Sequence, residues 1–343
     1  MNKNANLQTI PLIEATQDSL CGGKATGLAH ALGLGISVPN GFVVTDHAFQ
    51  SFLEQKKLGI KINDLLTSLS DENVTALNNC SEAISDLVVN APLPNGLIDT
   101  LIDQWNDSLS CSTLIVRSSA IGEDSLEASF AGQLESYLDI DTPEKLELAL
   151  KRCWASFWSE RSLAYQSLSG KQLQGMGVLI QCQVDSRLAG VLFTQPPMLD
   201  KSVKDDFMLG EYCFGQGVSL VSGQINPGRF RVFKNDLSWQ KICDPEQPET
   251  PGSSSELNSQ WIDPLANASV NLEVFHKQPQ DIEWALDRSG ELYIVQSRPI
   301  VLHSTSATTR PMITWTNANV RENFPDPITP LLYSCLLYTS DAA

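Results

Sequence analysis

Alternating apolar and polar residues between positions 281 and 298 predict a β-hairpin. Ile282, Trp284 and Leu286 alternate with polar residues, which is the period-two pattern of a strand with one buried face. Residues 287–290, Asp-Arg-Ser-Gly, have the composition of a turn, and residues 292–295 form a second apolar run. We therefore expect two antiparallel strands joined by this turn.

The polar positions of the hairpin carry groups that suit a metal ion and a phosphate. Asp281 and Glu283 are two residues apart, so their side chains point to one face of the first strand, and Gln296 and Arg298 have the same relation on the second strand. Carboxylates are ligands of Mg²⁺, and a guanidinium group binds phosphate oxygens. The alternative is a solvated face on which Glu283 pairs with Arg298 and only stabilises the hairpin.

Apolar residues at helical spacing dominate the first 110 residues. Leu28, Ala31 and Leu32 predict a helix that follows Gly22-Gly23-Lys24. Asp46 is expected to cap a second helix. Residues 60–110 are predicted to be helical, and nothing in them suggests chemistry.

The glycine pair before the first helix suits an anion. Such a turn lets backbone N–H groups face an anion at a helix start, and Lys24 would add positive charge. The segment is not a Walker A loop, because Ala25 stands where that motif needs Ser or Thr. On these residues alone, a glycine turn with a surface lysine is the favoured interpretation.

A second informative stretch surrounds Arg117. A buried strand is predicted to deliver Arg117 at its end, followed by hydroxyl-bearing and small residues, and an arginine in that setting can hold phosphate. Residues 129–133 suit a mobile flap, because Gly132 tolerates unusual backbone angles. The alternative is a surface loop in which Arg117 pairs with Glu123 or Asp124.

Later apolar runs predict further strands and two helices, the first with an apolar stripe from Leu146 to Trp158. Gln181 is expected to point from one strand into the site. Glu211 lies within an apolar run, and we expect it to meet a cation or a hydrogen-bond donor because an unpaired buried carboxylate is costly. The strands are expected at 176–184, 189–194, 207–214 and 228–233, a turn-rich strand pair at 215–223, a surface loop at 244–259, and the second helix at 265–275.

Composition narrows the class of protein. The 343 residues are 42% hydrophobic and 18% charged, which is typical of a globular protein with a sizeable core. The net charge of −17 argues against nucleic acid as the main partner. A nucleotide is compatible with this charge, because a local basic pocket can exist in an acidic protein.

The cysteines and the N-terminal residues bear on the cellular compartment of the protein. The eight cysteines include no Cys-x-x-Cys pair, which argues against a zinc site or a redox motif. We expect reduced thiols in the cytoplasm. The N-terminus has no signal-peptide pattern, and no apolar run approaches transmembrane length, so we expect no membrane partner.

Taken together, the motifs resemble the nucleotide-binding domain of the family that contains phosphoenolpyruvate synthase, pyruvate phosphate dikinase and rifampicin phosphotransferase. The similarity runs from about residue 20 to residue 330, with the motifs in the order of the family. They are Gly22–Leu28, Val38–Phe42, Val116–Ala120, Ser129–Gln133, Cys153–Ser159, Asp281–Ala285 and Gln296–Pro299.

The resemblance implies an α+β fold of the ATP-grasp type, built of several subdomains, with ATP and Mg²⁺ as cofactors. By the same resemblance, Lys24, Arg117 and Arg298 would hold the ATP phosphates as catalytic residues, and Gly132 would lie in a lid over the nucleotide. Glu283 and Gln296 would hold Mg²⁺. The remaining nucleotide-binding residues would be Gln181, Glu211 and Asp281. Residues 215–218 read Gly-Gln-Gly-Val where the family has Gly-Leu-Gly-Glu, so one carboxylate is missing.

We expect an N-terminal subdomain over 1–110, a nucleotide-binding region over 111–302, and a linker with the start of a further region over 303–343. Residues 335–343 fit no part of the family and look artefactual. The family continues into a phosphohistidine domain and an acceptor domain, which are expected to be missing here. None of the four histidines has the family's Thr-Ser-His setting, and we interpret His303 as a solvated linker residue.

The expected activity is the ATP half of a phosphotransferase. A phosphoryl group would pass from ATP through a phosphohistidine to pyruvate or a related acceptor, with release of AMP and phosphate. Two alternatives stay open: a fragment of a rifampicin-type antibiotic phosphotransferase, and a nucleotide-binding module that does not turn over.

Overall fold

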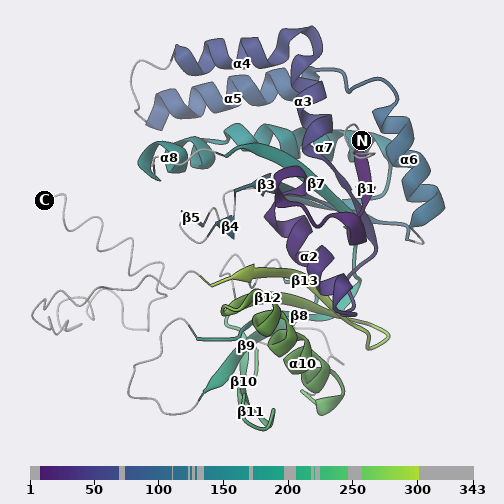
Figure 1. The fold of residues 1–343 in the computed structure, drawn as a ribbon, viewed down its shortest axis with the longest axis vertical. Coiled ribbons are helices and arrows are strands. Elements are labelled where there is room, and N and C mark those ends of the chain that lie inside the picture. The colour runs from purple at the N-terminus through teal and green to yellow at the C-terminus, as the bar shows by residue number, and fades with distance from the viewer. Residues whose placement is uncertain are drawn as a thin grey trace, which may run out of the picture. The chain divides into compact units, whose positions relative to one another are not determined.

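Two large antiparallel sheets, one small two-stranded sheet and the helices around them form the part of the chain that a computed structural model describes (Figure 1). The chain divides into two units, 1–301 and 302–343, and the described residues all belong to the first. They are 8–68, 74–109, 111–122, 124–125, 128–129, 135–169, 173–196, 206–217, 220, 225–245 and 257–300. The mixed helix and sheet content confirms the α+β prediction.

The first sheet has five strands, and β3 and β7 form its buried centre. All its neighbouring strands are antiparallel. In sheet order they are β1 (Thr9–Pro11), β2 (Gly41–Val44), β7 (Gly175–Cys182), β3 (Leu114–Ile121) and β6 (Ser136–Ile140).

Helices cover one face of this sheet (Figure 1). Phe49, Phe52, Trp154 and Trp158 are buried there, and the Phe52 and Trp154 ring centroids lie 4.7 Å apart, a favourable separation for an aromatic pair. The helices are α3 (Asp46–Glu54), α4 (Leu58–Thr67), α5 (Val74–Asn90), α6 (Leu97–Ser108), α7 (Pro143–Ala155) and α8 (Glu160–Ser169), with 3₁₀ turns η2 (Gln55–Lys57) and η3 (Ser156–Trp158).

The second sheet has six strands and contains the predicted hairpin. In the hairpin, Glu283 stands opposite Gln296 and Asp281 opposite Arg298, as the sequence pattern requires. Ile282, which points to the other face, is fully buried. In sheet order the strands are β11 (Trp239–Cys243), β10 (Gly228–Phe233), β9 (Phe207–Phe214), β8 (Ser186–Phe193), β12 (Gln280–Asp287) and β13 (Leu292–Pro299).

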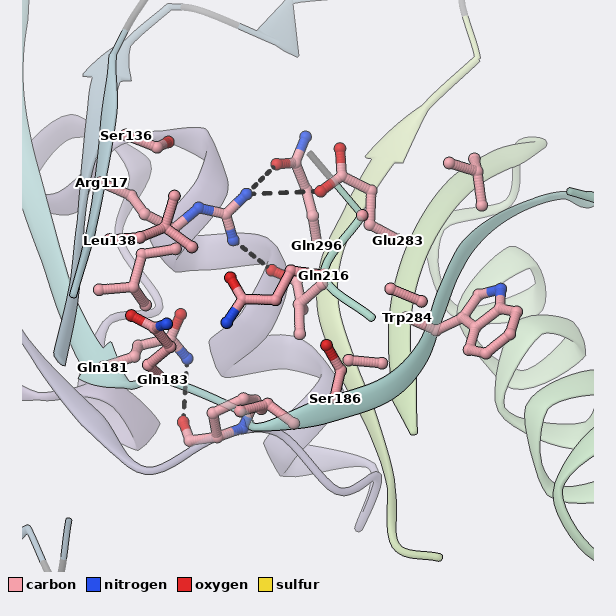
Figure 2. A pocket seen from close by; sticks show the side chains of 18 of the residues that line it. Arg117, Ser136, Leu138, Gln181, Gln183, Ser186, Gln216, Glu283, Trp284 and Gln296 are labelled. Atoms are coloured by element: carbon pink, nitrogen blue, oxygen red, sulfur yellow. Dashed lines mark hydrogen bonds and ion pairs between the residues drawn. The ribbon is translucent and has the colours of Figure 1, made fainter. Parts of the chain in front are cut away.

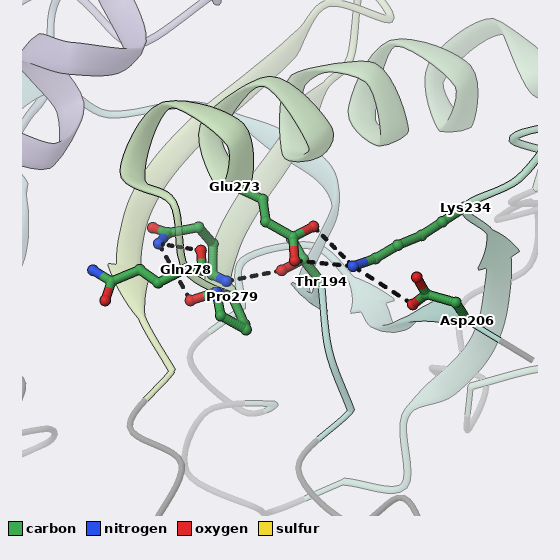
Figure 3. A network of polar contacts seen from close by, with 7 residues as sticks. Thr194, Asp206, Lys234, Glu273, Gln278 and Pro279 are labelled. Atoms are coloured by element: carbon green, nitrogen blue, oxygen red, sulfur yellow. Dashed lines mark hydrogen bonds and ion pairs between the residues drawn. The ribbon is translucent and has the colours of Figure 1, made fainter. Parts of the chain in front are cut away.

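Helix α10 (Ser259–His276) packs on the second sheet and is longer than the predicted 265–275. It begins earlier because the Asn258 side chain accepts a hydrogen bond from Gln260 N and so caps the helix. Near its other end, Glu273 accepts two hydrogen bonds from Lys234, the residue that directly follows β10, at 2.8 and 2.9 Å (Figure 3). This ion pair ties the helix to the strand.

Helix α2 (Gly23–Gly33) lies between the two sheets in Figure 1 and belongs to the core that includes the second sheet. Its buried Ala25, Leu28 and Ala29 share this core with Leu179 of β7 and Ile294 of β13. The short elements η1 (Leu12–Glu14) and α1 (Asp18–Cys21) precede it. The helix predicted from the spacing of Leu28, Ala31 and Leu32 is therefore confirmed, and it contacts both sheets.

The structure corrects three local predictions. Arg117 lies in the middle of β3, because the strand continues through the hydroxyl-bearing residues to Ile121 and pairs with β7 over its whole length. Asp46 is the first residue of α3 and not its cap; Thr45 holds that position, and Asp46 accepts a hydrogen bond from Met176 N instead. Residues 215–217 form a turn and not a strand.

The two large sheets take their described strands from successive parts of the chain. The strands predicted at 176–184 and 189–194 enter different sheets, and the chain crosses between them at residues 183–185. The predicted boundary at residue 110 does not coincide with a sheet boundary, since β1 and β2 pair in the same sheet as β3. The predicted flap at 129–133 lies outside the described residues except for Ser129, in the two-stranded pair of β4 (Asp124–Ser125) and β5 (Ala128–Ser129).

A disulfide joins Cys111 to Cys182, with a Cα–Cα distance of 5.8 Å. This contradicts the prediction that all the cysteines are reduced thiols; the two residues come together because the segment before β3 runs beside the end of β7. Cys21, Cys80, Cys153 and Cys213 are free and buried. Within the described part of the chain, no helix is long and apolar enough to cross a membrane.

The disulfide predicts a dependence of stability on reduction. It closes a loop over a sequence separation of 71 residues, and a loop of that size stabilises the folded state by about 4 kcal/mol in the chain-entropy account. We expect dithiothreitol to lower the free energy of unfolding in urea by up to this amount. Cys111→Ser is the control, since its stability should not respond to the reductant; an equal response of both proteins would contradict the crosslink.

Candidate functional site

A cavity of about 710 Å³ lies between the two sheets. Figure 2 shows that its side chains come from both sheets and converge on one space. Four cationic side chains line it, namely Lys24, Arg117, Arg161 and Arg298. A space of this size with several convergent polar groups is typical of a ligand pocket.

Arg117 crosses the cavity from β3 to the hairpin. Its Nη1 donates a hydrogen bond to Val295 O at 2.5 Å, and its Nη2 donates one to Gln296 Oε1 at 2.6 Å (Figure 2). The same Nη2 lies 3.5 Å from Glu283 Oε2. The side chain of Arg117 is only 8% exposed, so these partners replace water around a buried charge. The side chains of the predicted alternative partners, Glu123 and Asp124, lie outside the described part of the structure.

Arg298 has a carboxylate partner of its own. Its Nε and Nη2 both donate to Asp281 Oδ2, at 2.9 and 2.7 Å. Burial raises the pKa of Asp281, while the charge and hydrogen bonds of Arg298 oppose that rise. The contacts described here differ from the predicted alternative pair of Glu283 and Arg298: Arg298 binds Asp281, and Glu283 lies within ion-pair distance of Arg117.

Lys24 enters the cavity from the first turn of α2. That turn is fixed to β3, because Ala25 N donates to Ser119 Oγ at 3.1 Å. Gly22 is required at the helix start: its φ is +78°, and a Cβ there would lie 1.9 Å from Ser119 O. Burial raises the pKa of the Cys153 thiol, and the positive charge of Lys24 opposes the rise, which places that charge near the core of the first sheet.

Helix α2 also approaches the hairpin closely. A Cβ on Gly27 would lie 2.7 Å from Ser297 O of β13, closer than packed atoms come to one another. Glycine at this position therefore lets the helix contact the strand that carries Gln296 and Arg298. One helix thus fixes Lys24 relative to both walls of the cavity.

The donor set at Glu283 and Gln296 fits a hard divalent cation. Oxygens of both side chains face the same nitrogen of Arg117, so they converge on one point of the cavity wall. Carboxylate and amide oxygens are ligands that Mg²⁺ accepts, and this metal usually takes only one or two protein ligands beside phosphate and water. In the described part of the chain, no cluster of three or more His, Cys, Asp or Glu side chains could hold a metal.

The structure brings most of the predicted site residues together. Those lining the cavity are Lys24, Arg117, Gln181, Glu283, Gln296 and Arg298. Gln181 is buried, and its Nε2 donates to Pro39 O. Asp281 is not part of the lining, and its contact with the cavity is through Arg298.

Two predicted residues lie elsewhere or cannot be placed. Glu211 does not line the cavity; its Oε1 accepts a hydrogen bond from Arg229 Nε at 2.8 Å on the neighbouring strand. The prediction of a cationic partner for Glu211 is thereby confirmed, but its side chain is 26% exposed, not deeply buried. Gly132 lies outside the described residues.

Several lining residues were not predicted. Arg161, at the start of α8, follows the tryptophan-rich segment and gave no signal beyond its charge. Gln183 and Ser186 lie where the chain crosses from one sheet to the other, so only the three-dimensional path brings them to the cavity. Gln216 comes from the turn at residues 215–217.

The sequence of this chain matches a known protein family over most of its length. The family described as pyruvate phosphate dikinase, AMP/ATP-binding domain, matches residues 18–316. The chain belongs to this family. Of the described helices and strands, β1 and η1 lie outside that range and the others lie within it. The predicted resemblance is therefore confirmed.

Individual relatives are considerably longer than this chain. A probable phosphoenolpyruvate synthase of Methanocaldococcus jannaschii is 31% identical over 82% of the chain and 25% of the relative's length. The rifampicin phosphotransferase of Bacillus subtilis is 31% identical over 96% of the chain and 40% of its own length. The phosphoenolpyruvate synthase of Escherichia coli is 30% identical over 82% and 40%. The chain therefore spans less than half the length of each of these proteins.

Some solved structures align with parts of this chain at low scores. D-alanyl-alanine synthetase A from Vibrio cholerae aligns with a TM-score of 0.36 and 10% identity, over 83% of this chain and 56% of that one. An L-amino acid ligase from Bacillus licheniformis aligns with a TM-score of 0.30 and 14% identity, over 72% and 56%. Alignments at these scores do not establish a shared fold, and the ATP-grasp type stays a prediction from the family resemblance.

The close approach of α2 to β13 can be tested by a pair of glycine substitutions. Gly27→Ala puts a methyl group against Ser297 O, so we expect a loss of about 1–3 kcal/mol in stability and weaker nucleotide binding, because Lys24 moves with the helix. Gly33→Ala, in the same helix, meets no atom within 4 Å and should leave both unchanged. Calorimetry and thermal melts compare the two; equal melting temperatures would show that the contact does not constrain α2.

Proposed function

We propose that this chain binds Mg-ATP in the cavity between its sheets and is the ATP-side module of a phosphotransferase. The observation that carries the proposal is the arrangement of Lys24, Arg117 and Arg298 around one space with the Glu283–Gln296 oxygen pair on its wall. Family membership supports ATP as the nucleotide.

The cavity lining contains side chains suited to the phosphates and to the base of a nucleotide. Lys24, Arg117 and Arg298 are assigned to the phosphates, where charge-assisted hydrogen bonds are strong. Arg161 adds a fourth positive charge at the same cavity. The apolar side chains that line the cavity suit a flat purine base; they include Ile115, Leu138, Val184, Ala189 and Leu220.

Glu283 and Gln296 are assigned to Mg²⁺, which would neutralise charge on the phosphate oxygens when bound. The contribution of the protein is then to hold phosphates, metal ligands and base in a fixed relation and to place positive charge around the γ- and β-phosphoryl groups. Phosphoryl transfer is accelerated mainly by such positioning and charge stabilisation. Asp281 acts as a positioning residue, because it orients Arg298.

The complete reaction needs parts that the relatives have beyond the matched region. We propose that the phosphoryl group passes from ATP through a phosphohistidine on a further domain to pyruvate or a related acceptor, with AMP and phosphate as products, and that the protein acts in the cytoplasm. A rifampicin-type acceptor is the second candidate, because the relative named rifampicin phosphotransferase is matched over 96% of this chain.

The phosphate assignment predicts the effect of removing two cations. Lys24→Ala and Arg298→Ala should each weaken Mg-ATP binding by roughly 1.5–3 kcal/mol, the usual value of a hydrogen bond to a charged group. Isothermal titration calorimetry of each variant measures this loss. Arg298→Ala should also lower the melting temperature, because it leaves the buried Asp281 without its partner.

Arg288→Ala is the matched control, because Arg288 is exposed and pairs with Asp185 outside the cavity lining. It should bind Mg-ATP like the parent. Unchanged affinity in both Lys24→Ala and Arg298→Ala would remove the phosphate assignment and, with it, this location of the nucleotide.

A further inference from the structure

We propose that Arg117 occupies the place of the metal in the nucleotide-free protein, so that cations reach Glu283 and Gln296 only when phosphates draw Arg117 away. The inference rests on the proposed function, because it assigns the metal to this oxygen pair. It adds a statement about binding order to the assignment of Glu283 and Gln296 as metal ligands. Nucleotide and metal bind cooperatively, and metal binds weakly when nucleotide is absent.

The geometry of one nitrogen carries the proposal. Arg117 Nη2 lies 2.6 Å from Gln296 Oε1 and 3.5 Å from Glu283 Oε2, so it bridges the two oxygens proposed as metal ligands. Figure 2 shows both contacts converging on the same end of the guanidinium group. A positive charge therefore already stands where a metal ion bound to both oxygens would be placed.

The guanidinium group of Arg117 also has an N–H group that makes no described hydrogen bond. Its Nη1 binds Val295 O, but its Nε is buried and has no hydrogen-bond partner in the described structure. An unmade hydrogen bond on a buried charged group is unfavourable. Phosphate oxygens in the cavity would supply acceptors for Arg117 and so favour its release from Gln296 and Glu283.

Electrostatic repulsion keeps a metal ion and the Arg117 guanidinium group from occupying the space beside Glu283 and Gln296 together. A metal ion and a guanidinium group a few ångströms apart repel, and burial strengthens the repulsion. Phosphate groups attract both and separate them. Nucleotide should therefore raise the affinity for metal, and by thermodynamic linkage metal must raise the affinity for nucleotide by the same factor.

Arg298 does not share this role. Its Nε and Nη2 donate to Asp281 Oδ2, so a carboxylate that is separate from the proposed metal pair already faces its charge. Arg161 lines the same cavity but has no described contact with Glu283 or Gln296. The described contacts with both proposed metal ligands come from Arg117, and Arg161 provides a matched cation for comparison.

The test is a titration of the full chain with Mn²⁺ in the absence of nucleotide, with free Mn²⁺ counted by electron paramagnetic resonance. Arg117→Gln should bind Mn²⁺ about tenfold more tightly than the parent, because the opposing charge is gone. The same substitution should weaken metal-free nucleotide binding by about tenfold, because a charged phosphate contact is lost. Opposite changes from one substitution are the expected signature.

Controls separate this effect from a general change in charge. Arg161→Gln removes one cation from the same cavity and should leave Mn²⁺ affinity within about twofold of the parent. Glu283→Gln combined with Arg117→Gln should abolish the gain, because the carboxylate ligand is then missing. Arg117→Gln that binds Mn²⁺ no more tightly than the parent, or a gain of equal size in Arg161→Gln, would overturn the proposal.

A second measurement does not depend on the folding of an Arg117 variant. The parent and Glu283→Gln should show equally weak Mn²⁺ binding without nucleotide, because Arg117 already holds Glu283 in the parent. Tight Mn²⁺ binding by the parent that Glu283→Gln removes would contradict the proposal. Since no nucleotide is present, this result is independent of whether the phosphate assignment to Lys24 and Arg298 holds.

Discussion

One buried guanidinium group determines how the two sheets meet at the cavity. Arg117 comes from the centre of β3, yet the hydrogen bonds described for its side chain go to the hairpin, at Val295 and Gln296. A buried charge needs such partners, because leaving it without them costs several kcal/mol. The requirement fixes the hairpin against the first sheet and, through it, the positions of Glu283 and Arg298. The ion pairs on the hairpin thus stabilise the fold and shape the site at once.

Helix α2 imposes the second constraint. It is held to β3 through Ser119 at its first turn and approaches β13 at Gly27, so the distance between the two cavity walls is set by backbone contacts and by side chains together. Glycine is needed at both ends of this arrangement. A Cβ on Gly22 would strike Ser119 O, and a Cβ on Gly27 would strike Ser297 O. A motif that resembles a phosphate loop therefore also has a packing role, and the two roles require the same residues.

The sequence predicted those features that depend on local pattern. The hairpin, its register of charged residues and α2 follow from periodicity and turn composition, and the resemblance to a family assembled the distant motifs into one site. The partners of the charged groups could not be predicted, because Arg117 and Glu283 lie far apart along the chain and several pairings suited the spacing. The disulfide between Cys111 and Cys182 and the lining by Arg161 were missed for the same reason. Only the path of the chain brings these residues together.

The central claim is that Arg117 exchanges its hairpin partners for phosphate when nucleotide and metal bind. A crystal structure of the full chain with Mg²⁺ and a non-hydrolysable ATP analogue tests it most directly. The account predicts phosphate oxygens within hydrogen-bonding distance of the Arg117 guanidinium group, Glu283 coordinated to the metal, and the Arg117–Gln296 hydrogen bond broken. A nucleotide bound in the cavity while Arg117 still holds Gln296 and Glu283, or a nucleotide bound elsewhere, would contradict it.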